Sequence, residues 1–221
     1  MQDIVREHEA KRKQEFDTLQ SQINPHFLYN TLDIIVWMIE NEQKAEAVKV
    51  VTALARFFRI SLSRGKSLIT VKDELEHVRN YLMIQQMRFK NKFTYTIESD
   101  DEVLELASLK LMLQPLVENA IHHGLPAGEE TGLIRVLGYQ EDGDLFFSVS
   151  DNGDGIAPEE LAHLQDYIAG SNSDYTSIGL RNTHCRLELF FGKPYGLSIR
   201  SVPGRGTSVT LRMPLMHKPF A

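Results

Sequence analysis

The sequence is short of cysteine and of long apolar runs. Cys185 is the only cysteine among 221 residues, which excludes a disulfide framework within the chain and a zinc site built from cysteines, and which suits a reducing compartment. No uncharged run approaches the roughly 20 apolar residues that a membrane-spanning helix needs. The first residues, MQDIVREHEAKRKQEF, also lack the apolar segment of a secretory signal peptide. We therefore expect this stretch of chain to be soluble.

The sequence also has no excess of positive charge. Lys and Arg together number 24 against 30 Asp and Glu, so the formal net charge is −6 with neutral histidines. Proteins that bind nucleic acid neutralise its phosphates with an excess of basic side chains, and this composition therefore disfavours nucleic acid as a partner. Apolar residues make up 42% of the chain and charged residues 24%. These values are ordinary for globular proteins and favour one large domain or two small ones, each with a buried core.

Glycine is absent from residues 1–42, and Pro25 is the only proline there. Apolar residues recur in this stretch at every third or fourth position, which predicts a long helix. Its first turns are too polar to pack alone, which favours a coiled coil or a dimer. A second apolar stripe over residues 47–62 predicts another helix. The two helices would form a hairpin, and two hairpins a dimeric four-helix bundle. Because the sequence begins inside a charged helical pattern, we expect it to be the cytosolic end of a longer protein.

The pattern changes after a further helix, which we expect to start at Thr70 and to reach about residue 90. Phe93, Tyr95 and Ile97 then alternate with polar residues, as in a half-buried strand. Further strands are predicted over 133–139, 145–150, 197–202 and 208–213, and helices over 108–123, 158–169 and 178–191. This order predicts an α+β two-layer sandwich, a mixed sheet covered on one face by helices. We place the domain boundary between residues 91 and 92.

Four short segments stand apart from the packing pattern. They are residues 24–30 (NPHFLYN), 118–124 (ENAIHHG), 151–155 (DNGDG) and 179–182 (GLRN). The last three resemble, in this order, the N, G1 and G2 boxes of the GHKL ATPases, and the first resembles the phosphoacceptor box of sensor histidine kinases. The wording NPHFLYN together with LVENAIHHG is similar to the LytS/YesM-like subclass of those kinases. The resemblance runs from about residue 17 to residue 213.

The resemblance implies two domains. Residues 1–91 would be a dimerisation and histidine phosphotransfer domain, and residues 92–221 a GHKL (Bergerat) ATP-binding catalytic domain. The implied function is that of a two-component sensor histidine kinase core: ATP with Mg²⁺ phosphorylates His26, in the same or the partner subunit of a homodimer. The phosphoryl group then passes to an Asp of a response regulator receiver domain. An upstream membrane sensor domain is also implied, which would make this chain the cytoplasmic kinase portion of a bacterial inner or plasma membrane receptor.

His26 has the chemistry that a phosphoacceptor needs. A neutral imidazole nitrogen can attack the γ-phosphate of ATP and store the phosphoryl group for a later acceptor, and Pro25 would open the helix locally at this point. Asn30 lies four residues further on, on the same helix face, where its amide can orient a water against phosphohistidine in a phosphatase reaction. Phe27 stands where many histidine kinases carry an acidic residue, so the base for His26 is left open.

The segment ENAIHHG offers groups for a metal and for phosphate. The Asn119 amide oxygen can bind Mg²⁺, which also bridges nucleotide phosphates. The resemblance implies that Glu118 is the base, and a phosphate contact from His123, beside Gly124, is favoured over one from His122. A catalytic zinc is disfavoured, because no third ligand can be identified.

The segment DNGDG ends a predicted strand. The resemblance implies that the Asp151 carboxylate accepts a hydrogen bond from the adenine amino group and so selects adenine over guanine. Gly153 and Gly155 would let the backbone approach the base and would begin a lid over residues 156–178. A calcium loop is disfavoured, because the downstream Glu of an EF-hand is not correctly spaced and no flanking helix pair is predicted.

The last two segments would complete the nucleotide site. Gly179 opens a helix whose amide groups, with those of Leu180, can hold phosphate oxygens. Arg181 can pair with phosphate, and Asn182 is the partner typical of the subclass. Ser177 replaces the first glycine of the fuller Gly-x-Gly pattern, and its hydroxyl can still bind phosphate. At the predicted last hairpin, Gly204, Gly206 and Thr207 look like the final pocket segment, with Thr207 near adenine.

Two other functions remain open at this stage. One is a GHKL ATPase or ATP-gated dimerisation module that uses ATP for conformational change, with His26 incidental. The other is a silent interaction domain that binds no nucleotide, which the presence of Asn119, Asp151 and Gly179 disfavours.

Overall fold

The computed structural model describes residues 25–62, 67–90, 92–126, 131–170 and 178–217. The chain divides into two compact units, Met1–Gly65 and Lys66–Ala221. The predicted boundary lies further along the chain, after α4 (Val71–Arg88), a helix that belongs to the second unit. The two units are divided by compactness alone, and the domain limits 1–91 and 92–221 stay a prediction. Among the described helices, none is both long and apolar enough to cross a membrane.

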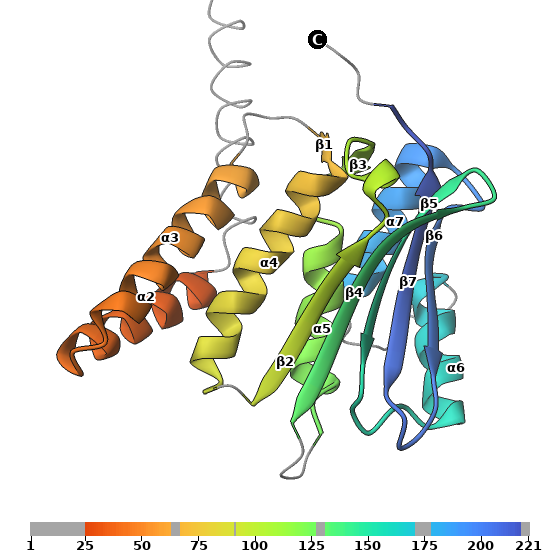
Figure 1. The fold of residues 1–221 in the computed structure, drawn as a ribbon. Coiled ribbons are helices and arrows are strands. Elements are labelled where there is room, and N and C mark those ends of the chain that lie inside the picture. The colour runs from red at the N-terminus through yellow and green to blue at the C-terminus, as the bar shows by residue number, and fades with distance from the viewer. Residues whose placement is uncertain (1–24, 63–66, 91, 127–130, 171–177, 218–221) are drawn as a thin grey trace, which may run out of the picture. The chain divides into compact units, whose positions relative to one another are not determined.

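The described part of the first unit is a helical hairpin. Helix α2 (Pro25–Glu40) and helix α3 (Lys44–Ser61) lie side by side in Figure 1 and are joined by a short turn at Glu42, whose φ is +61°. Apolar side chains fill the space between them, and the rings of Phe27 and Phe57 lie 5.0 Å apart. The predicted hairpin is confirmed for these residues. The predicted part of the first helix before Pro25, with its polar first turns, lies outside the described residues.

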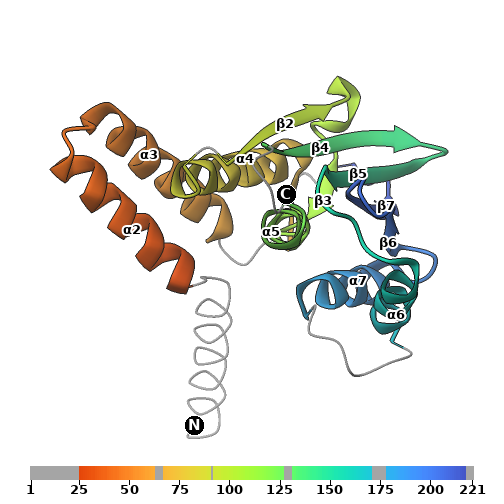
Figure 2. The same ribbon diagram turned by 90° about the horizontal axis from the view of Figure 1, so that it is seen from below.

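The second unit contains a five-stranded mixed sheet. Its strands are β2 (Phe93–Ser99), β4 (Gly132–Glu141), β5 (Asp144–Asp151), β7 (Thr207–Pro214) and β6 (Gly196–Ser201), in this spatial order. Strands β2 and β4 are parallel, and the other neighbours are antiparallel. Figures 1 and 2 show the helices of this unit on one face of the sheet. They are α4, α5 (Leu113–His123), α6 (Pro158–Ile168) and α7 (Ile178–Phe191). The predicted sandwich is confirmed.

The strands form where the sequence alternates. Side chains that face the helices are buried and apolar, such as Ile134 and Val136 on β4 and Phe147 and Val149 on β5, while their neighbours in sequence face the other side. Asp142 and Gly143 join β4 to β5 with φ values of +49° and +83°, as in a two-residue hairpin turn.

Helix α4 begins as predicted. The Thr70 hydroxyl oxygen accepts a hydrogen bond from the Asp73 N–H at 3.1 Å and caps the helix.

The start of α5 is not where the sequence predicted it. Instead of a helix from residue 108, the chain forms a short strand β3 (Ala107–Leu109), which pairs with β1 (Leu68–Thr70), and the helix begins only at Leu113. A single turn of 3-10 helix, η1 (Asp101–Val103), precedes β3. The prediction for residues 108–112 was wrong, because the partner strand of β3 lies about 40 residues away and leaves no local signal.

A buried carboxylate from α4 fixes this start. Glu74 is fully buried, and its two oxygens accept hydrogen bonds of 2.8 Å from the N–H groups of Leu111 and Leu113. The first N–H groups of a helix have no partner within the helix, so Glu74 acts as a cap supplied from another helix. Burial raises the pKa of the Glu74 carboxyl, and the hydrogen bonds from Leu113 and Leu111 oppose that shift. Leu111, with φ of +60°, turns the chain into the helix.

We predict that Glu74→Gln destabilises the second unit. The amide keeps the size of the side chain but replaces one acceptor oxygen by an NH₂ group, which would face a backbone N–H. A buried donor left without an acceptor costs about 1–3 kcal/mol. The free energy of unfolding, measured by urea denaturation, should fall by this amount.

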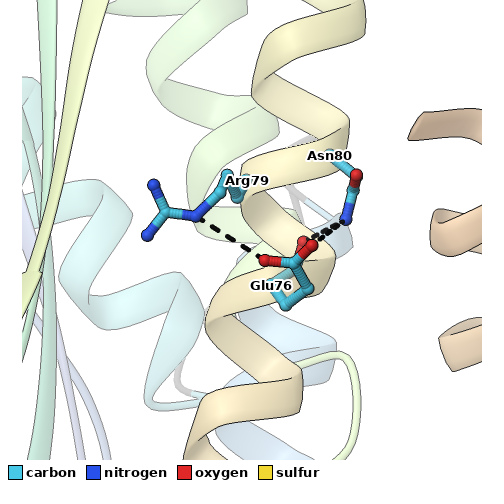
Figure 3. A network of polar contacts seen from close by, with 3 residues as sticks. All are labelled: Glu76, Arg79 and Asn80. Carbon is cyan, nitrogen blue, oxygen red and sulfur yellow. Dashed lines mark hydrogen bonds and ion pairs between the residues drawn. The ribbon is translucent and has the colours of Figure 1, made fainter. Parts of the chain in front are cut away.

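Glu76→Gln on the same helix is the matched control. Glu76 lies 3.7 Å from Arg79 in a partly exposed ion pair and accepts a hydrogen bond from Asn80 (Figure 3). Exposed pairs of this kind contribute only about 0–1 kcal/mol. Equal losses of stability in the two variants would contradict the capping role of Glu74.

Candidate functional site

Asp151 stands at the end of β5 and joins two neighbouring segments. Its Oδ1 atom accepts hydrogen bonds from the Gly153 N–H at 3.1 Å and from the Thr207 N–H at 3.0 Å. Burial raises the pKa of the Asp151 carboxyl, and these two hydrogen bonds oppose that shift. The carboxylate therefore ties the turn after β5 to the start of β7, and the structure brings together Asp151, Gly153 and Thr207.

Glycines let three chain segments meet at this carboxylate. A Cβ atom added to Gly124 would lie 2.3 Å from the Asp151 Cγ atom, and one added to Gly153 would lie 2.4 Å from the Gly124 carbonyl oxygen. Gly206 has a φ of +87°, and a Cβ atom there would lie 2.0 Å from the Asp151 carbonyl oxygen. No side chain fits at these three positions. The end of α5, the turn after β5 and the hairpin before β7 are thus in backbone contact.

Two further glycines lie beside this junction. Gly155 has a φ of +70°, and a Cβ atom there would lie 2.2 Å from the Val202 carbonyl oxygen. The N–H of Gly204 donates a hydrogen bond of 2.7 Å to the Asp154 carbonyl oxygen. The turn after β5 is therefore held against the β6–β7 hairpin along its length.

The sequence missed the main role of Gly124. From the sequence, this glycine was named only as the last residue of ENAIHHG, whereas the structure packs it directly against Asp151. Its place at the end of ENAIHHG was the only available signal, and that signal does not tell which residue the glycine meets.

Helix α5 carries the polar residues of ENAIHHG on one side. Glu118 and Asn119 are half-buried, and His122 and His123 are exposed in the last turn. The Gln114 amide donates a hydrogen bond of 2.9 Å to the Glu118 Oε1 atom. In the described part of the chain, no three His, Cys, Asp or Glu side chains cluster as a metal site would need. A Mg²⁺ ion fits Asn119 only if nucleotide phosphates and water supply its other oxygen ligands.

The first turn of α7 lies next to α5. A Cβ atom added to Gly179 would lie 3.5 Å from the Pro115 Cβ atom, an ordinary contact. Leu180 is buried, so only its backbone could meet a ligand, whereas Asn182 is exposed. The Arg181 guanidinium carbon lies 4.8 Å from the ring centre of Tyr167 on α6, a cation–π contact. Ser177 lies outside the described residues, as does residue range 171–177 of the predicted lid.

His26 and Asn30 belong to the first unit, on α2. His26 is exposed, and the Asn30 amide nitrogen lies 3.2 Å from its ring nitrogens. Phe27 is buried against Phe57, which gives a structural reason for an apolar residue at this position. One face of α2 therefore packs against α3, and another face carries the exposed imidazole of His26.

Two family models match the chain. The model described as histidine kinase matches residues 14–93, and the model described as histidine kinase-, DNA gyrase B-, and HSP90-like ATPase matches residues 105–217. The second match contains Glu118, Asp151 and Thr207, and the first contains His26.

Curated relatives and solved structures agree with these matches. The chain is 36% identical over 218 residues to the sensor histidine kinase YesM of Bacillus subtilis and 34% identical over 201 residues to the sensor protein LytS of Bacillus anthracis. These alignments cover 99% and 90% of this chain but only 36% and 34% of the relatives, so the chain spans about a third of their length.

Two solved structures share the fold. The catalytic domain of histidine kinase ThkA has a TM-score of 0.51 at 19% identity and covers 68% of this chain and 97% of that one. The histidine kinase domain of the Erythrobacter litoralis EL346 blue-light activated histidine kinase also has a TM-score of 0.51, at 18% identity, and covers 93% of this chain and 96% of that one.

We predict that Gly124→Ala weakens ATP binding. The φ of Gly124 is −102°, which any residue adopts, so the added methyl group is the only change. That methyl group would lie 2.3 Å from the Asp151 Cγ atom and 2.7 Å from the Ala120 carbonyl oxygen, so the Asp151 carboxylate has to move. Loss of a buried acceptor costs about 1–3 kcal/mol. Isothermal titration calorimetry with ATP measures the effect.

Gly179→Ala is the control for folding, since its methyl group would make only an ordinary contact. Both variants should keep the circular dichroism spectrum of the parent chain. An unchanged affinity for ATP in Gly124→Ala would remove the Asp151 carboxylate from the nucleotide site.

Proposed function

The chain belongs to the family of histidine kinase-, DNA gyrase B- and HSP90-like ATPases, and we propose that it is the kinase core of a two-component sensor histidine kinase. ATP phosphorylates His26, and the phosphoryl group then passes to an Asp of a response regulator. One observation carries this proposal: an exposed histidine, with an amide beside it, lies on a helical hairpin in the same chain as a GHKL-type sandwich.

The chemical step is a phosphoryl transfer to imidazole. The lone pair of a ring nitrogen of neutral His26 attacks the γ-phosphorus, the bond from this phosphorus to the bridging oxygen breaks, and ADP leaves. The ring then gives up the proton of its other nitrogen. Phe27 is buried in the hairpin and is no base, so we assign the proton to Glu118, which takes it directly or through a water.

The residues of the second unit bind the nucleotide. The Asp151 carboxylate, held by the Gly153 and Thr207 N–H groups, accepts a hydrogen bond from the adenine amino group and selects adenine. The Gly153, Gly155 and Gly206 backbone lies against the base. The first amides of α7, at Gly179 and Leu180, point away from the helix and bind phosphate oxygens.

The remaining side chains of the site meet the phosphates. They are Asn119, His123, Arg181 and Asn182, with Ser177 in the part of the chain outside the described residues. Asn119 offers an amide oxygen to Mg²⁺, which neutralises charge on the phosphates when bound. The Arg181 guanidinium makes a cation–π contact with the Tyr167 ring. In this position it forms an ion pair with a phosphate group of the nucleotide.

A second copy of the chain is the proposed partner of the hairpin. Large apolar residues are exposed on the side of α2 away from its buried stripe, at a spacing of three to four residues. They are Tyr29, Leu32, Val36 and Ile39. Tyr29 is 65% exposed, and α3 adds the exposed residues Val48 and Val51. A stripe of this spacing is typical of a helix that packs against another, so two hairpins would form a four-helix bundle.

The remaining partners follow from the curated relatives. YesM is called a sensor histidine kinase and LytS a sensor protein, and this chain spans about a third of each. We infer that a sensor domain precedes the kinase core and that the core is the cytoplasmic portion of a bacterial membrane receptor. Acidic residues outnumber basic ones by 30 to 24, which disfavours nucleic acid as a partner.

Radiolabelling tests the function. The purified chain is incubated with γ-labelled ATP and Mg²⁺ beside its His26→Gln variant, and one sample of each contains EDTA. We expect label in the parent chain that is acid-labile and alkali-stable, as for phosphohistidine, and no label in His26→Gln or with EDTA. Both proteins should bind ATP equally.

The opposite result would favour the second function. If neither protein is labelled although both bind and hydrolyse ATP, the chain is a GHKL ATPase or an ATP-gated dimerisation module.

Asn30 is proposed to orient a water against phosphohistidine or the phosphorylated regulator. Asn30→Ala should slow dephosphorylation of a phosphorylated receiver domain by about a hundredfold, the lower end for general catalysis by one side chain, without abolishing phosphorylation of His26. Asn41→Ala is the matched control, because Asn41 is an exposed amide on the same hairpin that donates a hydrogen bond to the Trp37 carbonyl. Equal dephosphorylation rates in all three proteins would refute the role of Asn30.

A further inference from the structure

A hydroxyl group on the last residue of β6, Ser201, has three hydrogen-bond partners. Its Oγ atom accepts a hydrogen bond of 2.8 Å from the Ile156 N–H. The Gly206 carbonyl oxygen and the Thr207 Oγ1 atom each lie 2.9 Å from the same atom. Ser201 is half-buried and Thr207 is buried. The hydroxyl therefore joins the turn after β5 to the start of β7.

The Ser201 hydroxyl has one proton and two neighbours that can accept it. A backbone N–H always donates, so Ile156 occupies one of the two lone pairs of the Ser201 oxygen. If Ser201 donates to the Gly206 carbonyl oxygen, the Thr207 hydroxyl donates to Ser201. If Ser201 donates to Thr207 instead, the Thr207 proton is released, and Gly206 still accepts a hydrogen bond of 3.3 Å from the Val202 N–H. Thr207 thus offers a ligand an acceptor in the first arrangement and a donor in the second.

Thr207 lies beside the carboxylate that we assign to the adenine amino group. Its N–H donates a hydrogen bond of 3.0 Å to the Asp151 Oδ1 atom. On the edge of adenine, the N1 atom lies next to the amino group and accepts a hydrogen bond, whereas the amino group donates. A base whose amino group meets Asp151 therefore needs a donor for N1 close to that carboxylate.

We propose that Ser201 is a positioning residue that acts through Thr207: its hydroxyl donates to the Thr207 Oγ1 atom and so directs the Thr207 proton to N1 of adenine, directly or through one water. This inference rests on the proposed function, in which ATP binds at Asp151. The hydrogen bonds then run in one direction, from the Ile156 N–H through two hydroxyls to the base. Hydrogen bonds in such a chain polarise and strengthen one another. Without Ser201, the Thr207 hydroxyl has to be ordered when the base binds, and this ordering weakens binding.

The same hydroxyl holds the entry into α6. Ile156 stands two residues before Pro158, the first residue of this helix. Further along α6, the Gln165 amide donates a hydrogen bond of 3.0 Å to the Ile199 carbonyl oxygen of β6. Strand β6 thus holds α6 at two points. Loss of the Ser201 hydroxyl also removes one of these anchors, an effect that does not depend on which base is bound.

Isothermal titration calorimetry with ATP and 1-deaza-ATP tests the proposal in the full chain. The analogue keeps the amino group and has a C–H group in place of N1. The parent chain should bind ATP about tenfold more tightly than 1-deaza-ATP, as expected for one hydrogen bond. In Ser201→Ala this ratio of Kd values should fall to about twofold, because the Thr207 donor is no longer fixed. The loss of the α6 anchor weakens both nucleotides alike and leaves the ratio unchanged.

A double-mutant cycle tests whether Ser201 acts through Thr207. Thr207→Val removes the hydroxyl and nearly keeps the shape of the side chain, so it should abolish the preference for ATP over 1-deaza-ATP. Adding Ser201→Ala to Thr207→Val should not change the ratio further, because the effect of Ser201 passes through this one hydroxyl.

Ser148→Ala is the matched control. Ser148 on β5 is also half-buried, and its hydroxyl oxygen lies 3.2 Å from that of Ser208. Its loss should leave the ratio of Kd values as in the parent chain. An unchanged ratio in Ser201→Ala, or equal Kd values for the two nucleotides in the parent chain, would overturn the proposal. If Ser201→Ala does not fold, Ser201→Cys answers the same question, because a thiol is a weak donor.

The two readouts separate this inference from the proposed function. If Ser201→Ala loses the preference for ATP but the parent chain is never labelled on His26, the inference holds and the kinase function fails. If the parent chain is labelled on His26 but Ser201→Ala weakens both nucleotides equally, the kinase function holds and the role of Ser201 is refuted. A parent chain that binds neither nucleotide would refute both.

Discussion

The buried carboxylate of Glu74 determines where α5 begins, and the candidate nucleotide site depends on that position. Polar side chains are costly to bury unless hydrogen bonds compensate for the lost water. Here two backbone N–H groups at the start of α5 supply those hydrogen bonds. The start of α5 fixes where Glu118 and Asn119 lie along the helix, and the helix ends with Gly124 against Asp151. A shift of the helix by one residue would turn its polar face away from the site.

The site itself is built more from backbone than from side chains. Asp151 is held by two N–H groups, and three glycines allow the surrounding segments to approach within a distance that no Cβ atom permits. Backbone groups of this kind are fixed by the sheet and by α5, so they need no further ordering when a ligand arrives. This arrangement suits the recognition of a flat base.

The proposed chemistry is divided between two units of different construction. The hairpin contributes one exposed imidazole and one amide on α2, while Phe27, the residue after His26, packs inward. The sandwich contributes the carboxylates, the glycine junction and the first turn of α7. The hairpin also has a second apolar stripe that its own two helices leave exposed, which is the physical basis for the proposed second copy.

The sequence alone determined the order of the long helices and of the five strands of the large sheet, the cap at Thr70 and the motif segments, because each depends on residues close together in the chain. It also indicated the glycines and Asp151, since these residue types carry chemistry that a packing pattern does not require. The tertiary structure decided the pairing of β1 with β3, the capping of α5 by Glu74 and the contact of Gly124 with Asp151. These contacts join residues about 30 to 40 positions apart, and only the folded chain brings them together.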